Sequence, residues 1–106
     1  MTSQFLHLHN VLDTTEYSGQ KTISAAGTAE RLHSDLPCNG PLLVKAFHAN
    51  AGDVYIGNVN GDVSSTNGML LDAGDEVYFS MVHKLRELWV DVGTNDDGVA
   101  FMFLRI

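Results

Sequence analysis

The sequence predicts an all-β protein, an antiparallel β-sandwich of about seven or eight strands with a jelly-roll-like arrangement. Two observations predict it. Polar clusters that contain glycine recur at short intervals, and runs rich in β-branched and aromatic residues lie between them. Asn-Gly and Asp-Gly pairs supply the positive φ of tight hairpins, and closely spaced turns are typical of sandwiches and barrels. We therefore expect hairpins at these clusters and little helix.

The β-prone runs between the turn clusters predict the strands. They are residues 5–11, 21–25, 42–49, 53–57, 76–81, 87–92 and 99–106. In the run 87–92, Leu88, Val90 and Val92 alternate with Glu87, Trp89 and Asp91, which is typical of a half-buried strand. Around residues 82–86, apolar residues at helical spacing favour a short helical turn as much as a strand.

The last run is apolar on both faces. Val99, Phe101 and Phe103 share one face, and Ala100, Met102, Leu104 and Ile106 share the other. A strand covered on both faces lies in the centre of a sheet or at a contact between subunits. We therefore expect one of these two positions for residues 99–106.

The chain divides into two parts. Residues 12–20 are polar with weak periodicity, so residues 1–20 are expected to form an N-terminal arm attached to a β-sandwich domain at 21–106. The run 5–11 within this arm is strand-like and suited to pairing with the sheet edge of another protein.

Length and composition indicate one soluble domain. The chain has 106 residues, 44% of them hydrophobic, and 13 acidic against 6 basic residues give a net charge of −7. This acidity disfavours nucleic acid as a partner, and the single Cys38 excludes an internal disulfide. No apolar run approaches the roughly 18 residues of a membrane span, and the N-terminus lacks signal-peptide features. We expect a protein that begins near Met1, made in a reducing cytoplasm, with no membrane partner.

The candidate metal ligands do not form a convincing set. His7 and His9 would project from one face of a strand, and with Asp13 and Gly19 they loosely resemble the first motif of cupins. Cupins need strands before this pair, and only six residues precede His7. We expect two surface imidazoles, no metal site and no cofactor.

No catalytic set can be assembled from the remaining residues either. His33, His48 and His83 stand alone, no G-x-S-x-G motif is present, and Cys38 lacks a neighbouring base. We therefore expect no catalytic residues and no enzyme activity, with Cys38 as a small buried hydrophobe.

Two further groups suggest binding. Oxygen-bearing side chains gather at Asp91, Asn95, Asp96 and Asp97, a composition that can hold calcium, although an Asp-Gly hairpin is the favoured interpretation. Tyr55, Tyr78 and Trp89 are expected on the faces opposite the aliphatic residues of their strands. Aromatic side chains placed there bind either sugars or other proteins.

Three segments of the second half of the chain, "NAGDVYIG", "STNGMLLDAGDEVYF" and "LWVDVGTNDDGVAF", follow a recognisable order. They resemble small virion proteins of tailed bacteriophages, in which an Asn-x-Gly-x-Val-Tyr-(Val/Ile)-Gly hairpin precedes Gly-x-x-Leu-x-x-Gly-(Asp/Glu) and an Asp-Gly-Val turn. The matching residues are Asn50, Gly52, Val54, Tyr55, Ile56 and Gly57, then Gly68, Leu71, Gly74 and Asp75, then Leu88, Trp89, Val90, Gly98 and Val99.

This resemblance implies a noncatalytic β-sandwich of the virion, most simply a capsid decoration (cement) protein bound to the major capsid protein. A tail or baseplate accessory protein and a carbohydrate-binding module are the alternatives. The resemblance and the apolar last strand together favour a homo-oligomer, with a trimer expected. The interface candidates are Phe5, Leu6, Leu8, Tyr55, Trp89, Phe101, Phe103 and Leu104.

Overall fold

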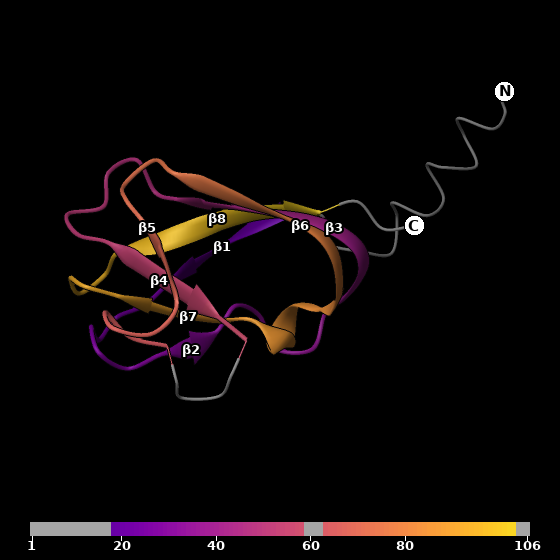
Figure 1. The fold of residues 1–106 in the computed structure, drawn as a ribbon, viewed down its shortest axis with the longest axis horizontal. Helices are drawn as coiled ribbons and strands as arrows, with labels where there is room; N and C mark the ends of the chain where they lie inside the picture. Colours follow the sequence, from indigo (N-terminus) through magenta and orange to yellow (C-terminus); the bar gives the residue numbers. More distant parts are fainter. Residues whose placement is uncertain (1–17, 59–62, 104–106) are drawn as a thin grey trace, which may run out of the picture.

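A computed structural model describes residues 18–58 and 63–103, and this part of the chain is an eight-stranded β-sandwich (Figure 1). The strands are β1 (Ser18–Thr22), β2 (Glu30–Arg31), β3 (Pro37–Ala46), β4 (Val54–Gly57), β5 (Met69–Leu71), β6 (Glu76–Lys84), β7 (Trp89–Val92) and β8 (Gly98–Phe103). Sheet A has the order β1-β8-β3-β6, and sheet B has the order β2-β7-β4-β5. Every strand pair is antiparallel, which confirms the predicted fold class.

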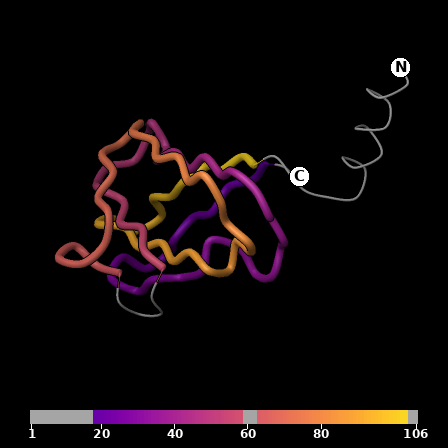
Figure 2. The backbone as a smooth tube through the Cα atoms, turned by 45° about the vertical axis from the view of Figure 1, so that its right-hand side comes forward, coloured from indigo at the N-terminus to yellow at the C-terminus, as the bar shows by residue number. Residues whose placement is uncertain are grey.

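The strand order follows a simple rule. β1 pairs with β8, β2 with β7, β3 with β6, and β4 with β5. The chain is therefore arranged as one long antiparallel hairpin whose turn lies between β4 and β5. This hairpin is folded into two sheets, which is the jelly-roll arrangement. Figure 2 shows the first and last described strands running side by side along one sheet.

This topology corrects the expectation of hairpins. Among the described strands, β4 and β5 are the one consecutive pair that shares a ladder, and the other connections lead from one sheet to the other. The cluster at residues 93–98 thus joins β7 of sheet B to β8 of sheet A and forms no hairpin. Gly, Asn and Asp allow the chain to reverse, but they do not decide which strand the next segment pairs with.

The core lies between the two sheets and follows from alternation along the strands. Leu42, Val44 and Ala46 of β3 are fully buried, and so are Val90 and Val54 from sheet B. β8 (Gly98–Phe103) lies between β1 and β3, so of the two positions expected for the last strand the central one is observed. Its inward side chains are Val99, Phe101 and Phe103.

Several boundaries differ from the sequence prediction. β2 and β5 were not predicted, because two and three residues are too short to show alternation. The expected boundary between residues 20 and 21 falls inside β1, which begins at Ser18. The predicted strand at 5–11 lies outside the described residues.

The Asn39-Gly40 pair lies inside a strand and makes no turn. β3 runs through it from Pro37, and the register against β6 shifts on both sides of Gly40. Asn39 has a φ of 52°, in the left-handed region that Asn tolerates. The pair is therefore a bulge that bends the strand.

Both alternatives for residues 82–86 are found in part, because β6 continues to Lys84 before the chain turns. A 3₁₀ turn, η1 (Leu85–Glu87), follows β6, and Leu85 is fully buried. The backbone N–H of Leu85 donates to the carbonyl of Leu36 at 2.9 Å, and Arg86 Nε lies 3.1 Å from Asp35 Oδ1. These contacts fix the corner that leads from sheet A to sheet B.

Gly98 is required where β8 begins. A Cβ atom at this position would overlap the carbonyl oxygen of Lys21 and lie 2.9 Å from Thr22 Cα, because β1 passes directly beside it. The close approach of β1 therefore depends on the missing side chain.

We predict that Gly98→Ala destabilises the fold by about 1–3 kcal/mol, because β1 must move to make room. Urea unfolding of the variant and the parent chain measures the difference. Ser80→Ala, at an exposed position of the same sheet, is the control and should stay within about 0.5 kcal/mol. Equal stability of the Gly98→Ala variant and the parent would contradict the close approach.

Candidate functional site

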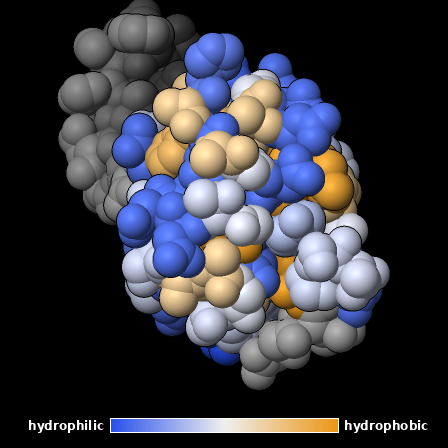
Figure 3. Space-filling model, turned by 90° about the vertical axis from the view of Figure 1, so that its left-hand side faces the viewer, coloured by the Kyte–Doolittle hydropathy of each residue, from blue (hydrophilic) through white to orange (hydrophobic). Residues whose placement is uncertain are grey.

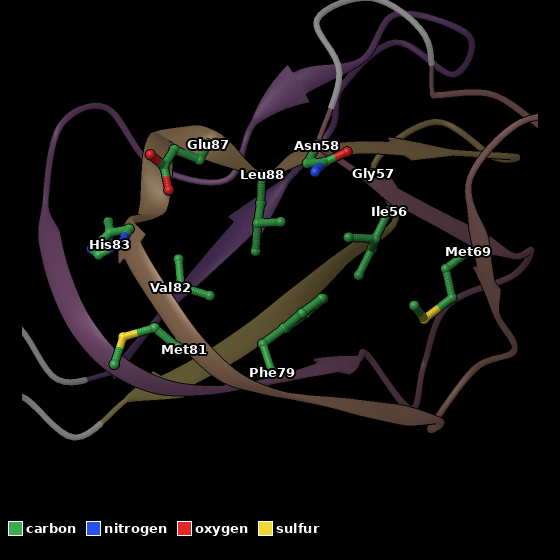
Figure 4. A pocket seen from close by; sticks show the side chains of 10 residues that line it. All are labelled: Ile56, Gly57, Asn58, Met69, Phe79, Met81, Val82, His83, Glu87 and Leu88. Carbon is green, nitrogen blue, oxygen red and sulfur yellow. The ribbon is translucent and has the colours of Figure 1, made fainter.

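A groove lies between the two sheets at one edge of the sandwich, with a volume of about 620 Å³ (Figure 4). It is lined by Ile56, Gly57, Asn58, Met69, Phe79, Met81, Val82, His83, Glu87 and Leu88. Leu88 points across the groove toward Phe79, and Ile56 and Val82 flank them. The floor is thus formed by the apolar core itself.

Two methionines stand at opposite ends of this groove (Figure 4). Met81 is 57% exposed and Met69 is 45% exposed. Because Met side chains are flexible and polarisable, they adapt to apolar surfaces of varied shape. The groove can therefore accept an apolar side chain.

The opposite edge of the sandwich is closed. Lys21 of β1 and Glu30 of β2 form an ion pair across the two sheets, with 2.7 Å between Nζ and Oε1. Both strands are edge strands of their sheets. This pair joins the sheets at one side, whereas the groove leaves them apart at the other.

A second candidate surface is the outer face of sheet A. Leu43 of β3 is directly opposite Tyr78 of β6 on one side and Met102 of β8 on the other. Tyr78 is 65% exposed, Met102 is 56% exposed, and Leu43 is half-buried. These three side chains form a cross-strand apolar row, which we call the sheet A row.

The structure places two predicted interface residues in the core. The alternation along β8 points Phe101 and Phe103 inward, where they are 3% and 2% exposed, so neither ring can meet a partner. Met102, which points outward between them, was not singled out as a candidate, because both faces of this strand are equally apolar in sequence. Phe5, Leu6, Leu8 and Leu104 lie outside the described residues.

The three aromatic candidates do not form one surface. Tyr55 and Trp89 belong to sheet B and Tyr78 to sheet A. Tyr55 is buried, which corrects the expectation that it is exposed. Trp89 is half-buried under Arg31, whose guanidinium carbon lies 4.7 Å from the centre of the ring system. Tyr78 alone of the three is freely exposed.

The acidic cluster binds backbone amides. The carboxylate of Asp97 accepts the N–H of Ala51 at 3.1 Å and that of Gly52 at 2.8 Å. Asn50 makes two reciprocal bonds with Gly98: its amide nitrogen donates to the Gly98 carbonyl, and its side-chain oxygen accepts the Gly98 N–H. We call these four bonds the loop junction, because they tie the β3–β4 loop to the start of β8.

Other oxygens of this cluster are also bonded to backbone. Asn95 Oδ1 accepts the N–H of Ala26, and Asp91 Oδ1 accepts the N–H groups of Gly27 and Val92. Within residues 18–58 and 63–103, no three His, Cys, Asp or Glu side chains gather so that they could hold a metal ion. The cluster connects loops across the molecule where a local Asp-Gly hairpin was expected.

The loop end of the sandwich, seen in Figure 3, has a surface of mixed hydropathy. In the connection between β5 and β6, the pKa of the Asp72 carboxyl is raised, first by its hydrogen bond with Asp53 and then by the negative charge of Asp53. The two carboxylates stabilise a shared proton and repel one another when both are ionised.

Among the described residues considered as catalytic candidates, the cysteine is buried and the histidines are more exposed. Cys38 is fully buried, its thiol donates to the carbonyl of Gly40 at 3.4 Å, and burial raises its pKa. His48 and His83 are exposed, and the ring of His33 meets that of Phe101 edge-on at 6.2 Å. His7, His9 and Asp13 lie outside the described residues.

No protein-family model matches this chain, and no curated protein matches it. In the part of the chain that the structure describes, no helix is long and apolar enough to cross a membrane.

We predict that Asp97→Asn costs about 1.5–3 kcal/mol, the usual value of hydrogen bonds to a charged group, because the two N–H groups lose their carboxylate. Asp96→Asn removes the same charge from the neighbouring exposed residue, whose φ of 71° suits Asn. It should stay within about 0.5 kcal/mol of the parent chain in urea unfolding. Similar losses in both variants would indicate a general charge effect and contradict the loop junction.

A pH-dependent effect is expected at Asp72. Because its pKa is raised in the folded protein, its contribution to stability is fully present below the ordinary value of 3.8 and is lost as the pH rises through the raised pKa. Asp72→Asn should therefore raise the Tm at neutral pH relative to the parent, and the gain should vanish in acid. Added salt should reduce the gain, because the side chain is exposed. A Tm difference that does not change with pH would contradict the repulsion.

Proposed function

We propose that this chain is a noncatalytic structural protein of a tailed-bacteriophage virion, a capsid decoration protein that binds the major capsid protein on the head. The observation that carries the proposal is the sheet A row. It is a continuous apolar strip of Met102, Leu43 and Tyr78. Met102 and Tyr78 contact solvent unless a partner covers them. Contiguous exposed apolar patches mark protein interaction surfaces.

The resemblance to virion proteins supports the proposal through the architecture. Its matched residues Asn50, Gly52 and Gly98 belong to the loop junction, so the shared pattern corresponds to a real constraint on the fold. Jelly rolls occur in viral capsid domains and also in lectins and cupins. Because one fold hosts many functions, the proposal depends on the exposed apolar surfaces.

The proposed partners are other copies of this chain and the capsid. The sheet A row is suited to contact between copies in a trimer, because Met102 and Tyr78 extend from a rigid sheet. The methionine-flanked groove, with its apolar floor, is a second surface for the capsid protein.

The proposed mechanism is mechanical stabilisation. A decoration protein that binds the assembled shell, and does not bind the separated subunits, shifts the equilibrium toward the shell by mass action. Its contacts across neighbouring capsid subunits would oppose the outward pressure of packaged DNA. A tail or baseplate accessory protein would use the same surfaces on a different particle.

The test is co-sedimentation of the full chain with purified heads that lack it and, separately, with purified tails. Binding to heads supports decoration, and binding to tails alone replaces it with the tail alternative. Failure to bind either particle overturns the virion proposal. Deletion of residues 1–12 should leave the domain folded and weaken binding, because the strand-like run 5–11 is suited to pairing with a sheet edge of the capsid.

We predict that Met102→Glu lowers the oligomeric state in light scattering and weakens head binding, because it places a charge in the sheet A row. Leu70→Glu is the matched control, since Leu70 is 50% exposed on sheet B. Circular dichroism should show both variants folded. If Leu70→Glu has the larger effect, the interface lies on sheet B and the assignment to sheet A is wrong.

A further inference from the structure

A second cavity lies on the outer face of sheet B, with a volume of about 390 Å³. Its walls include Gly27, Tyr55, Ser64, Ser65, Asp91 and Gly93. It is separate from the groove in Figure 4, with which it shares none of its lining residues. The volume falls at the lower end of the roughly 300–1,000 Å³ of small-molecule sites.

Asp91 brings an unsatisfied acceptor to this cavity. The residue is 2% exposed, and its Oδ1 accepts the N–H of Gly27 at 3.0 Å and that of Val92 at 2.7 Å. Its Oδ2 accepts no hydrogen bond from any residue of the described ranges. Buried polar atoms almost always have a partner, so this oxygen requires a donor from outside the described chain.

Tyr55 provides a second free group beside it. Tyr55 is directly opposite Asp91 in the pairing of β4 with β7, and it is 9% exposed. Its hydroxyl lies 3.3 Å from the position that a Cβ at Gly93 would occupy, so the glycine leaves this group accessible. The hydroxyl makes no hydrogen bond within residues 18–58 and 63–103. Buried tyrosine hydroxyls usually find a partner.

The chemistry of the cavity selects a class of ligand. No Lys or Arg lines it, and a net charge of −7 disfavours anions. A carboxylate oxygen accepts, whereas the hydroxyls of Tyr55 and Ser65 both donate and accept. A small ring that carries several hydroxyl groups can pair with all of these donors and acceptors. We propose that the cavity is a saccharide-binding site in which Asp91 Oδ2 and Tyr55 Oη bond to ligand hydroxyls.

The test is a titration of the full ¹⁵N-labelled chain with D-glucose, D-galactose and N-acetyl-D-glucosamine, observed by NMR. One of the sugars should shift the amide signals of Gly27 and Gly93. Tyr55→Phe keeps the ring and removes the hydroxyl, so it should weaken binding about tenfold. Tyr78→Phe removes the equivalent hydroxyl from the exposed tyrosine of sheet A and should leave binding unchanged. Asp91→Asn provides a second variant if Tyr55→Phe fails to fold.

Three results would overturn the proposal. The first is no shift with any of the sugars up to about 50 mM, where even a millimolar Kd would be saturated. The second is unchanged sugar binding in Tyr55→Phe, or in Asp91→Asn where that variant replaces it. The third is the same shifts with calcium or sodium chloride alone, which would make the cavity a cation site. Head binding is measured separately, so neither proposal depends on the other.

Discussion

The fold depends on the loop junction, the four hydrogen bonds that join the β3–β4 loop to Asp97 and Gly98. Nearly every connection in this topology leads from one sheet to the other, so few local ladders hold successive strands together. Buried N–H and C=O groups in the loops must still find partners. Asn50 and Asp97 supply them from side chains, and the same segment is held to β1 through backbone bonds between Ile23 and residues 96 and 97. This end of the sandwich therefore fixes the mutual position of β1, β4 and β8.

The two edges of the sandwich have opposite properties, and the candidate surfaces follow from this difference. The ion pair between Lys21 and Glu30 covers the edge formed by β1 and β2, where a partner would have to separate two charges. At the other edge no ion pair between described residues spans the groove, which is lined by Leu88 of the core and by Phe79, a half-buried side chain packed against it. The sheet A row adds a flat apolar face next to the same edge strand, β6. Apolar contact with a partner is thus available on one side of the molecule.

The sequence predicted the fold class because alternation and turn chemistry are local signals, and these are strong in strands such as β3 and β8. It could not predict the pairing, because Asn-Gly and Asp-Gly clusters give the same signal for a hairpin and for a crossing between sheets. β8 shows a second limit. Its alternation was read correctly, but both of its faces are apolar, so only tertiary packing assigns Phe101 to the core and Met102 to the surface. Tyr55 shows a third, since its place on the outer face of sheet B does not reveal that the side chain is buried.

The residues that hold the framework differ from the exposed apolar residues of sheet A. Asn50 is fixed by the two hydrogen bonds of its side chain to Gly98, and Gly98 is fixed by the close approach of β1. Met102 and Tyr78 have no comparable constraint, since each contacts solvent across most of its surface. A partner can therefore select these exposed residues without altering the framework. Recognition on the outer face of sheet A is therefore expected to depend on residues other than those that specify the fold.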